Sequence, residues 1–237
     1  MVKRGFDLFV GGLALALLSP LLLTIAIAVW LEGRAPVFYR GVRIGRGGVP
    51  FRIWKFRTMC VEAEGVGPSS TSADDSRLTR IGRLLRRFKL DELPQLLNVV
   101  RGEMSFVGPR PQVPWAVALY GPPEQALLKV RPGITDYASI VFADEAEILR
   151  DSGDPDHQYL EKIAPEKIRL GLEYVEHCSL SLDIRIITAT ICRLVGMSYS
   201  GILRIPSTSG TIAPRCETRV EKRLNEAAPD GNRASSG

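Results

Sequence analysis

Cysteine and histidine are scarce in this chain of 237 residues, which has four of the first and two of the second. The cysteines are scattered, with no paired metal-ligand spacing, and this is typical of reduced thiols in a cytoplasmic domain. The two histidines, His157 and His177, are too isolated for a histidine metal site. Internal repeats and a Gly-x-x-x-x-Gly-Lys-Ser/Thr loop are also missing, and the missing loop argues against an ATP-dependent phosphotransferase.

Basic and apolar residues, by contrast, are plentiful. The net charge is +5 and the isoelectric point is near 9.2, which favours a polyanionic partner such as nucleic acid, anionic lipid headgroups or phosphorylated substrates. The mean hydropathy of +0.05 is high for a chain with 24% charged residues, so one segment must carry much of the apolar weight. The length suffices for one domain with a buried core.

That apolar segment is the run Leu8 to Leu31, which contains no charged residue and is long enough to span a bilayer as a helix. A secretory signal is the first alternative, because a basic start precedes the run. The run is long for a signal sequence, however, and no small-residue cleavage site follows it. The sequence therefore favours a retained membrane helix.

Two features argue against a simple span. Ser19-Pro20 lies in the middle of the run, where proline removes a backbone hydrogen bond and kinks a helix. Basic residues lie on both sides, Lys3 and Arg4 before the run and Arg34 after it, and a straight span cannot place both sets in the cytoplasm. A helix broken at Ser19-Pro20 can enter and leave by one face, and the serine hydroxyl can supply a partner for the backbone groups that the break frees. Physical reasoning leaves this re-entrant helix and a kinked single span both open.

The richest stretch for chemistry is 77–111, where the carboxylate pair Asp91-Glu92 lies within a run of arginines. Arginine forks match phosphate oxygens, and neighbouring carboxylates suit Mg²⁺ bound together with substrate phosphates. Pro94 predicts a helix start here, which places both acids near a helix N-terminus, where anions are favoured. The alternative is a solvated basic helix followed by an acidic helix start.

Further cations lie in predicted strands and turns. A β-hairpin is predicted over 36–59, and within it Lys55 and Arg57 point to one side of a strand. They either contact phosphates or protect a basic edge strand from aggregation. Arg110 is presented by a rigid Gly-Pro-Arg-Pro turn, and Arg131 precedes a second Pro-Gly.

The segment KLDELPQLLNVVRGEMSFVGPRP, residues 89–111, closely resembles the signature of bacterial sugar transferases, the monotopic phosphoglycosyl transferases. The resemblance extends over about 3–196: Lys3-Arg4, Asp7 and Ser19-Pro20 match the membrane motif, and KFRTM at 55–59 matches another element. A PGIT element also matches, but the DYASI that follows it departs from the Gly and Gln frequent in the family. That departure bears on the choice of sugar.

The resemblance implies transfer of a sugar 1-phosphate from a UDP-sugar to a polyprenyl phosphate such as undecaprenyl phosphate, with release of UMP. Asp91 would be the nucleophile that forms an aspartyl phospho-sugar intermediate, and Glu92, with Asp91, would hold Mg²⁺. The phosphate and nucleotide contacts it implies, strongest candidates first, are Arg86, Arg110, Lys55, Arg57 and Arg131. The expected partners are the two substrates and inner-membrane lipids rather than nucleic acid, with a homo-oligomer as one option.

The resemblance also decides for the re-entrant helix and implies an α/β fold, mostly helical with a small β-hairpin, on the cytoplasmic face of the inner membrane. The expected parts are a re-entrant membrane helix (1–35), a cytoplasmic catalytic domain with interfacial amphipathic helices (36–204) and a disordered tail (205–237). A loop is expected at 62–76, a solvated acidic helix at 144–149 and an amphipathic helix at 181–196.

Another class of function also fits part of the pattern: a membrane-anchored binding or regulatory protein whose basic surface meets anionic lipid or nucleic acid. It accounts for the charge and the apolar run, but leaves the acidic pair inside the basic cluster unexplained. The sequence names neither the sugar nor the glycan that the reaction would begin.

Overall fold

The computed structural model describes residues 2–34, 36–61, 75–149 and 155–206. The expected loop at 62–76 therefore lies almost entirely outside the described residues, as does the expected tail from 207 onward. Residues up to Ile205 form one compact unit, which includes the apolar N-terminal helix. This unit is mostly helical with small sheets, as the sequence predicts.

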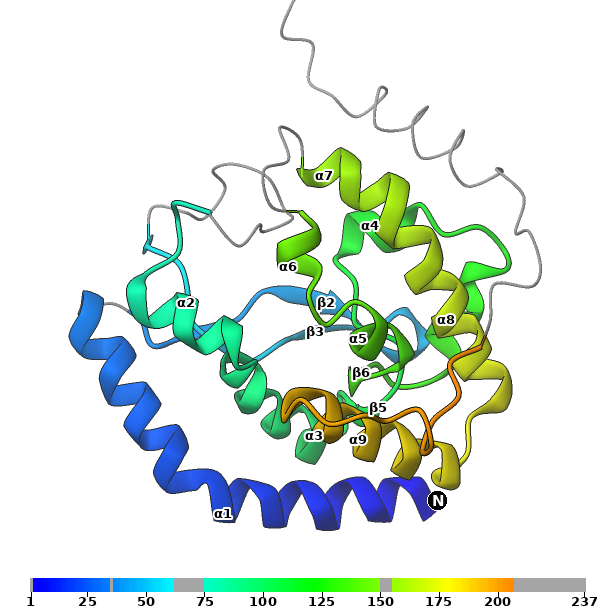
Figure 1. Ribbon diagram of the computed structural model, residues 1–237, viewed down its shortest axis with the longest axis horizontal. Coiled ribbons are helices and arrows are strands. Elements are labelled where there is room, and N and C mark those ends of the chain that lie inside the picture. The colour runs from blue at the N-terminus through cyan, green and yellow to red at the C-terminus, as the bar shows by residue number, and fades with distance from the viewer. Residues whose placement is uncertain (1, 35, 62–74, 150–154, 207–237) are drawn as a thin grey trace, which may run out of the picture. The chain divides into compact units, whose positions relative to one another are not determined.

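The apolar run folds as helix α1 (Val2–Gly33), which contains Pro20 and changes direction near its middle (Figure 1). Because Pro20 has no N–H, the carbonyl of Ala16 loses its helical partner. The Ser19 hydroxyl donates a hydrogen bond to that carbonyl at 2.8 Å, as predicted from the sequence. By length and composition α1 is apolar enough to cross a membrane, and only 11% of its most apolar window is buried against the rest of the protein.

The first turns of α1 are fixed to the rest of the unit by polar contacts. Lys3 Nζ pairs with Asp183 and donates to the carbonyl of Val107 at 3.1 Å. Arg4 donates to the carbonyls of Val99 and Val100 at 2.6 and 2.8 Å, which caps the C-terminus of helix α3 (Leu96–Arg101).

Asp7 completes this set of contacts. It is 1% exposed and accepts hydrogen bonds from Ser105 Oγ at 3.0 Å and from the backbone N–H of Phe106 at 3.2 Å. The charged and polar residues at the start of α1 therefore bind protein groups.

The other end of α1 is held by apolar packing. Ile25 and Val29 form a buried cluster with Phe56 and Leu85. Leu85 belongs to helix α2 (Arg80–Arg87), whose N-terminus is capped by the hydroxyl of Thr79, which accepts from Gly82 N at 2.9 Å. Both halves of α1 therefore contact the same compact unit.

The predicted hairpin forms two short antiparallel ladders. β1 (Phe38–Tyr39) pairs with β4 (Lys55–Phe56), and β2 (Val42–Ile44) pairs with β3 (Pro50–Arg52). A short turn, η1 (Arg46–Gly48), links the inner strands at the glycines that predict it. This outer part of the fold delivers Lys55 to the site.

A parallel pair forms deeper in the unit, where β5 (Ser105–Val107) lies beside β6 (Gly133–Thr135). The helices that follow β5 in the described residues are α4 (Pro114–Ala118), η4 (Glu124–Lys129), α5 (Tyr137–Val141), α6 (Glu145–Ile148), α7 (Pro155–Gln158), η5 (Tyr159–Ile163), α8 (Ala164–His177) and α9 (Leu180–Leu194). Of these, α5 and α9 pack against the two strands.

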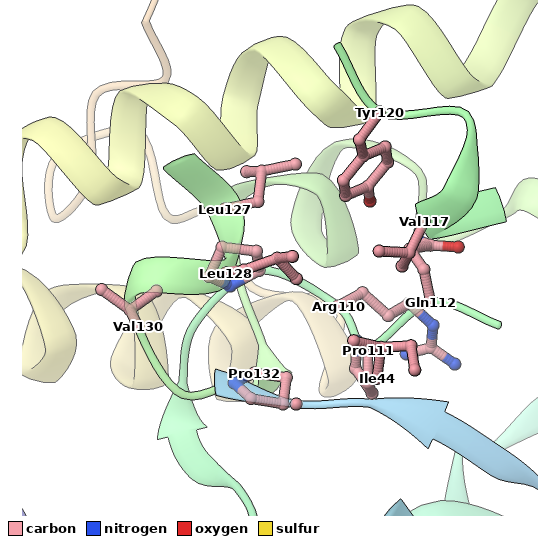
Figure 2. A pocket seen from close by; sticks show the side chains of 12 residues that line it. Ile44, Arg110, Pro111, Gln112, Val117, Tyr120, Leu127, Leu128, Val130 and Pro132 are labelled. Atoms are coloured by element: carbon pink, nitrogen blue, oxygen red, sulfur yellow. The ribbon is translucent and has the colours of Figure 1, made fainter. Parts of the chain in front are cut away.

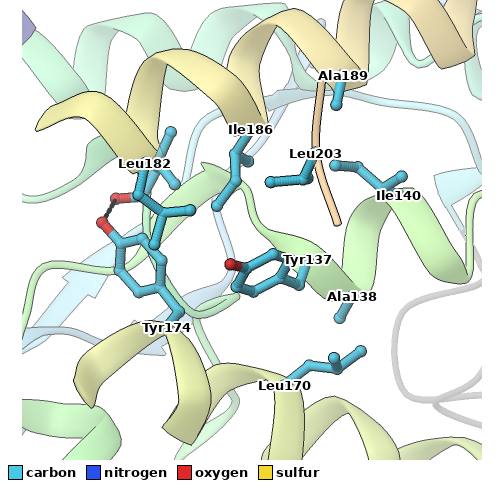
Figure 3. Packing of buried hydrophobic residues seen from close by; sticks show 10 residues of the cluster. Tyr137, Ala138, Ile140, Leu170, Tyr174, Leu182, Ile186, Ala189 and Leu203 are labelled. Carbon is cyan, nitrogen blue, oxygen red and sulfur yellow. Dashed lines mark hydrogen bonds between the residues drawn. The ribbon is translucent and has the colours of Figure 1, made fainter. Parts of the chain in front are cut away.

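The largest buried cluster joins α5, α8 and α9 to the end of β5. Tyr174 and Ile186 are fully buried members of this cluster, and the Tyr174 hydroxyl donates to the carbonyl of Val107 at 3.1 Å (Figure 3). On α9, Ile186 faces this core, whereas Ile184 and Ile191 are 49% and 56% exposed. The predicted helix at 181–196 thus packs on the core through one apolar face and leaves a second apolar face open.

Candidate active site

The acidic pair is positioned by a sharp change in backbone direction. α2 ends at Arg87, and Lys89 adopts a left-handed conformation with φ of 56° before the 3-10 helix η3 (Leu90–Gln95) begins. Asp91 and Glu92 occupy the first turn of η3, as predicted from Pro94. The arginines of α2 and the two carboxylates are therefore brought close together by a single turn.

Glu92 is held by two cations. Lys55 Nζ donates to Glu92 Oε1 at 2.6 Å. The Arg110 guanidinium donates to both carboxylate oxygens of Glu92, from Nη2 to Oε1 and from Nη1 to Oε2, the latter at 3.3 Å. Burial acts to raise the pKa of Glu92, but the charges and hydrogen bonds of Arg110 and Lys55 outweigh it and hold the pKa well below its usual range. Glu92 is therefore ionised and fixed in orientation.

Asp91 has different surroundings from its neighbour. It is 6% exposed, and its carboxylate accepts no hydrogen bond from the part of the chain that the structure describes. Burial raises the pKa of Asp91 above its usual value, and the charge of Glu92 adds to this, while Lys55 opposes it. An ionised carboxylate with unoccupied oxygens is a competent nucleophile.

Arg110 reaches Glu92 from a rigid loop at the end of β5. A Cβ added at Gly108 would lie 2.2 Å from the carbonyl oxygen of Arg131, and one added at Gly133 would lie 2.1 Å from Gly108 N. Both positions therefore require glycine, because the backbones around Gly108 and Gly133 lie too close together to admit a Cβ atom. The backbone N–H of Arg110 donates to Asp136 at 3.2 Å, which fixes the loop from a second side.

Arg86 completes the cluster of predicted residues. Its Nε donates to Thr58 Oγ1 at 3.0 Å. Burial lowers the pKa of Arg86, and the carboxylate that opposes this most strongly is Asp91. The structure thus brings together Asp91, Glu92, Lys55, Arg86 and Arg110.

Two predicted cations lie elsewhere. Arg131 donates from Nε to the carbonyl of Gly102 at 2.8 Å, so it helps Arg4 to cap the end of α3. Arg57 lies against the last residue of α1, since a Cβ added at Gly33 would be 2.8 Å from Arg57 Nη2. In the described part of the chain, the side chains that hydrogen-bond to Glu92 are those of Lys55 and Arg110 and not those of Arg57 or Arg131.

Sequence reasoning missed Asp136, whose carboxylate accepts a hydrogen bond from the backbone N–H of Arg110. Asp136 is 3% exposed, and its Oδ1 accepts from the N–H and the hydroxyl of Ser139, both at 2.7 Å. It is the N-cap of α5, and an aspartate before a helical segment with serine three residues later is a detectable capping signal. It lies in the DYASI segment that departs from the family pattern.

The interpretation of 144–149 as a solvated acidic helix is wrong for Glu145. Glu145 pairs with Lys167 at 2.6 Å, with the side chains 30% and 11% exposed. Its negative charge contributes to the raised pKa of Arg110, after the larger effect of Glu92. No local pattern could reveal this pair, because its partner lies on α8, far along the chain.

A small cavity opens beside Arg110, with about 300 Å³ of empty space that includes open solvent (Figure 2). Most of the residues that line it are apolar, Ile44 and Val117 among them, and Arg110, Gln112 and Tyr120 contribute polar groups. Burial raises the pKa of Tyr120, so its hydroxyl stays protonated and can donate a hydrogen bond.

The residues fit a magnesium ion only in company with phosphate. Both oxygens of Glu92 already face cations, and Asp91 offers the open carboxylate. Lys55, Arg86 and Arg110 outnumber the two acids, so a bare divalent ion meets net positive charge here. A diphosphate would neutralise this excess and supply oxygen ligands, which is how Mg²⁺ usually binds.

Comparison of the chain with known proteins identifies its family. The family model for bacterial sugar transferase matches residues 1–197. A UDP-glucose:undecaprenyl-phosphate glucose-1-phosphate transferase from Caulobacter vibrioides is 37% identical over 200 residues, which cover 81% of this chain and 69% of that protein. Exopolysaccharide production protein ExoY from Rhizobium meliloti is 37% identical over 206 residues, which cover 81% of this chain and 84% of the relative.

Other relatives are longer. A UDP-N-acetylgalactosamine-undecaprenyl-phosphate N-acetylgalactosaminephosphotransferase from Aeromonas hydrophila is 36% identical over 195 residues, which cover 80% of this chain but 43% of that protein. This chain thus spans less than half of some curated relatives that it matches. The family model matches most of the chain, and two of the relatives are matched over most of their own length. The chain therefore belongs to the bacterial sugar transferase family.

Proposed function

We propose that this protein transfers a sugar 1-phosphate from a UDP-sugar to undecaprenyl phosphate, the initiating step of a bacterial surface glycan. Family membership supports this proposal, as do the relatives whose names specify an undecaprenyl-phosphate acceptor. The observation that carries the proposal is the difference between the hydrogen-bond partners of Asp91 and those of Glu92. Glu92 is held by Lys55 and Arg110, while the buried Asp91 carboxylate accepts no hydrogen bond from the described residues.

In the first step, an Asp91 oxygen attacks the β-phosphorus of the UDP-sugar. The bond between that phosphorus and the oxygen bridging the two phosphates breaks, and UMP leaves with the bridging oxygen. In the second step, an oxygen of the lipid phosphate attacks the same phosphorus and the bond to Asp91 breaks. The lipid diphosphate sugar is released and the Asp91 carboxylate is restored.

Arg110, Lys55 and Arg86 bind the diphosphate and orient it toward Asp91. Their forks and ammonium group face the carboxylates from fixed positions, and preorganised cations stabilise the charge that develops as the phosphorus–oxygen bond breaks. Mg²⁺, held by Glu92 and Asp91 with the phosphates, would neutralise charge on the diphosphate. Arg57 and Arg131 remain candidates for contacts outside this centre.

We place α1 in the membrane as a re-entrant helix, with the catalytic unit on the cytoplasmic face of the inner membrane. Contact of both halves of α1 with one compact unit supports this topology, because the ends of a straight span lie on opposite sides of a bilayer. The bend of α1 in Figure 1 and the open apolar face of α9 support a shallow position at the surface.

The test is a transfer assay with radiolabelled UDP-sugars and undecaprenyl phosphate in membranes that contain the protein. We expect label in a lipid-extractable diphosphate sugar and stoichiometric release of UMP. A panel of UDP-sugars then identifies the donor. Absence of lipid-linked label with every donor, while the protein binds anionic vesicles, would instead support a membrane-anchored binding protein.

A further inference from the structure

We propose that Arg57 is the binding site for the phosphate monoester of the lipid acceptor, at the level where α1 leaves the membrane. This inference rests on the proposed function and assigns its second substrate to a defined side chain. It separates the acceptor phosphate, at Arg57, from the donor diphosphate, at Lys55, Arg86 and Arg110.

Two of the three guanidinium nitrogens of Arg57, Nε and Nη1, are inaccessible to solvent and make no hydrogen bond in the part of the chain that the structure describes, although the residue as a whole is half-buried. Buried polar atoms without a partner are unfavourable, and binding of an ion or a ligand is one way in which native proteins satisfy them. The contrast with Arg86 and Arg110 is clear, since each of those has a side-chain partner.

The position of Arg57 links the membrane helix to the active site. Its guanidinium lies against Gly33, the last residue of α1. Its backbone N–H donates to the carbonyl of Val37 at 2.8 Å, which fixes the chain just after β4. In an extended chain Lys55 and Arg57 point to the same side. Lys55 reaches Glu92, so one short segment carries one cation to the acidic pair and, two residues on, a second cation to the end of α1.

The acid of α1 that is nearest in sequence to Gly33 bonds through one oxygen to the protein backbone rather than to this arginine. Glu32, one residue before Gly33, accepts a hydrogen bond from the backbone N–H of Ile81 at 3.1 Å. Trp30, one turn before Gly33, is 49% exposed. Tryptophan favours the headgroup level of membranes, which places Arg57 at the depth of a lipid phosphate.

A phosphate monoester suits this position. Its oxygens accept paired hydrogen bonds from a guanidinium, and its negative charge removes the penalty of the unpaired cation. The lipid tail would follow the exposed apolar surface of α1, on which Leu23, Ile27 and Leu31 are at least half exposed. The phosphate would then approach Asp91 from the side of Lys55.

The first test is thermal unfolding of the purified protein in detergent, with the variant Arg57→Met. Without ligand, we expect Arg57→Met to unfold at the same or a higher temperature than wild type, because an unpaired buried charge is removed. Polyprenyl phosphate should raise the Tm of wild type and leave that of Arg57→Met unchanged. Arg52→Met, which removes an exposed arginine of β3, should respond like wild type.

The added ligands distinguish the possible sources of phosphate. Polyprenol, inorganic phosphate and phosphatidylglycerol should each give a smaller rise in wild-type Tm than polyprenyl phosphate. An equal rise with inorganic phosphate would identify a free-anion site, and an equal rise with phosphatidylglycerol a general headgroup site. Either result would overturn the acceptor assignment, as would a ligand-free Arg57→Met that unfolds well below wild type.

The second test separates the two substrates kinetically. At saturating donor, Arg57→Met should raise the KM for polyprenyl phosphate at least about tenfold, the loss expected for a charge-assisted hydrogen-bonded pair, with the KM for UDP-sugar unchanged. A change confined to the donor KM would overturn the inference. A wild-type protein with no transfer from any donor would instead refute the proposed function, and the unfolding test would still decide whether Arg57 binds lipid phosphate.

Discussion

Lys3 and Asp183 form an ion pair between the first turn of α1 and helix α9. Asp183 is 1% exposed and also accepts from the hydroxyl of Tyr174 at 2.7 Å. Lys3 donates to the carbonyl of Val107, in the strand that leads to the Arg110 loop, and the Tyr174 hydroxyl shares its single proton between Asp183 and that carbonyl. The start of α1 and the Arg110 loop therefore share one buried polar cluster.

A double-mutant cycle should detect this coupling. Lys3→Met leaves the buried Asp183 carboxylate without its cation and should reduce the free energy of unfolding by about 2–3 kcal/mol, less than for a fully buried pair because Lys3 is partly exposed. Asp183→Asn in the Lys3→Met background should then cost less than in wild type. Additive effects, measured by denaturant unfolding in detergent, would show that the pair contributes nothing.

The topology of α1 can be read by cysteine accessibility. With Val2→Cys and Arg34→Cys, neither position should react with an impermeant reagent in intact cells, and both should react after permeabilisation. Labelling of position 2 from outside would establish an ordinary span. Pro20→Leu restores a helical N–H and favours a straight helix of roughly 36 Å, so it should give mixed topology and reduced transfer.

Asp91→Asn should abolish transfer while UDP-sugar binding survives. The amide is close in shape to the carboxylate but is a poor nucleophile. Binding of labelled UDP-sugar and transfer are measured on the same preparation. Activity within about tenfold of wild type would remove Asp91 from the role of nucleophile.

Glu92→Gln should alter the response to Mg²⁺ as well as the rate. The substitution replaces a carboxylate ligand by a neutral oxygen, and it weakens the hydrogen bonds and charge attraction between this residue and Lys55 and Arg110. Activity titrated against Mg²⁺ should show a higher midpoint than wild type. An unchanged midpoint would assign the metal to other residues.

The pH dependence of kcat/KM should report Asp91 in the free enzyme. Because the pKa of Asp91 is raised, activity should fall, as the pH is lowered, at a higher pH than an ordinary aspartate with a pKa near 3.9 would give. Lys55 lowers the pKa of Asp91, so Lys55→Met should move this acidic limb to still higher pH. A limb that stays in place or moves to lower pH would contradict the assignment.

Local chemistry made part of the structure predictable. Pro20 removes one specific backbone bond, so the freed carbonyl of Ala16 follows from covalent structure, and the neighbouring Ser19 hydroxyl is the nearest group in sequence that can bond to it. Pro94 likewise fixes the start of the turn that carries Asp91 and Glu92. Such features depend on neighbours in sequence, which a single chain displays directly.

Partners distant in sequence were not predictable in the same way. Lys3 and Arg4 were interpreted as charges flanking a membrane segment, and the sequence did not reveal that they also bind Asp183 and the carbonyls at the end of α3. Arg131 is predicted as a phosphate contact and stays a prediction, while the hydrogen bond from its Nε to the end of the same helix was not foreseen. An arginine that meets a carbonyl and one that meets a phosphate have the same sequence signature, and only packing separates them.

Attachment of α1 at both ends also bears on the lipid composition that the protein tolerates. A spanning helix must match the full hydrocarbon thickness, and mismatch costs fractions of a kcal/mol per Å. In the proposed topology α1 samples a single leaflet, and its depth is set by Lys3 at one end and Val29 at the other. Acyl-chain length in the opposite leaflet then has no means of shifting Asp91 relative to the headgroups, so one active-site geometry serves membranes of different thickness.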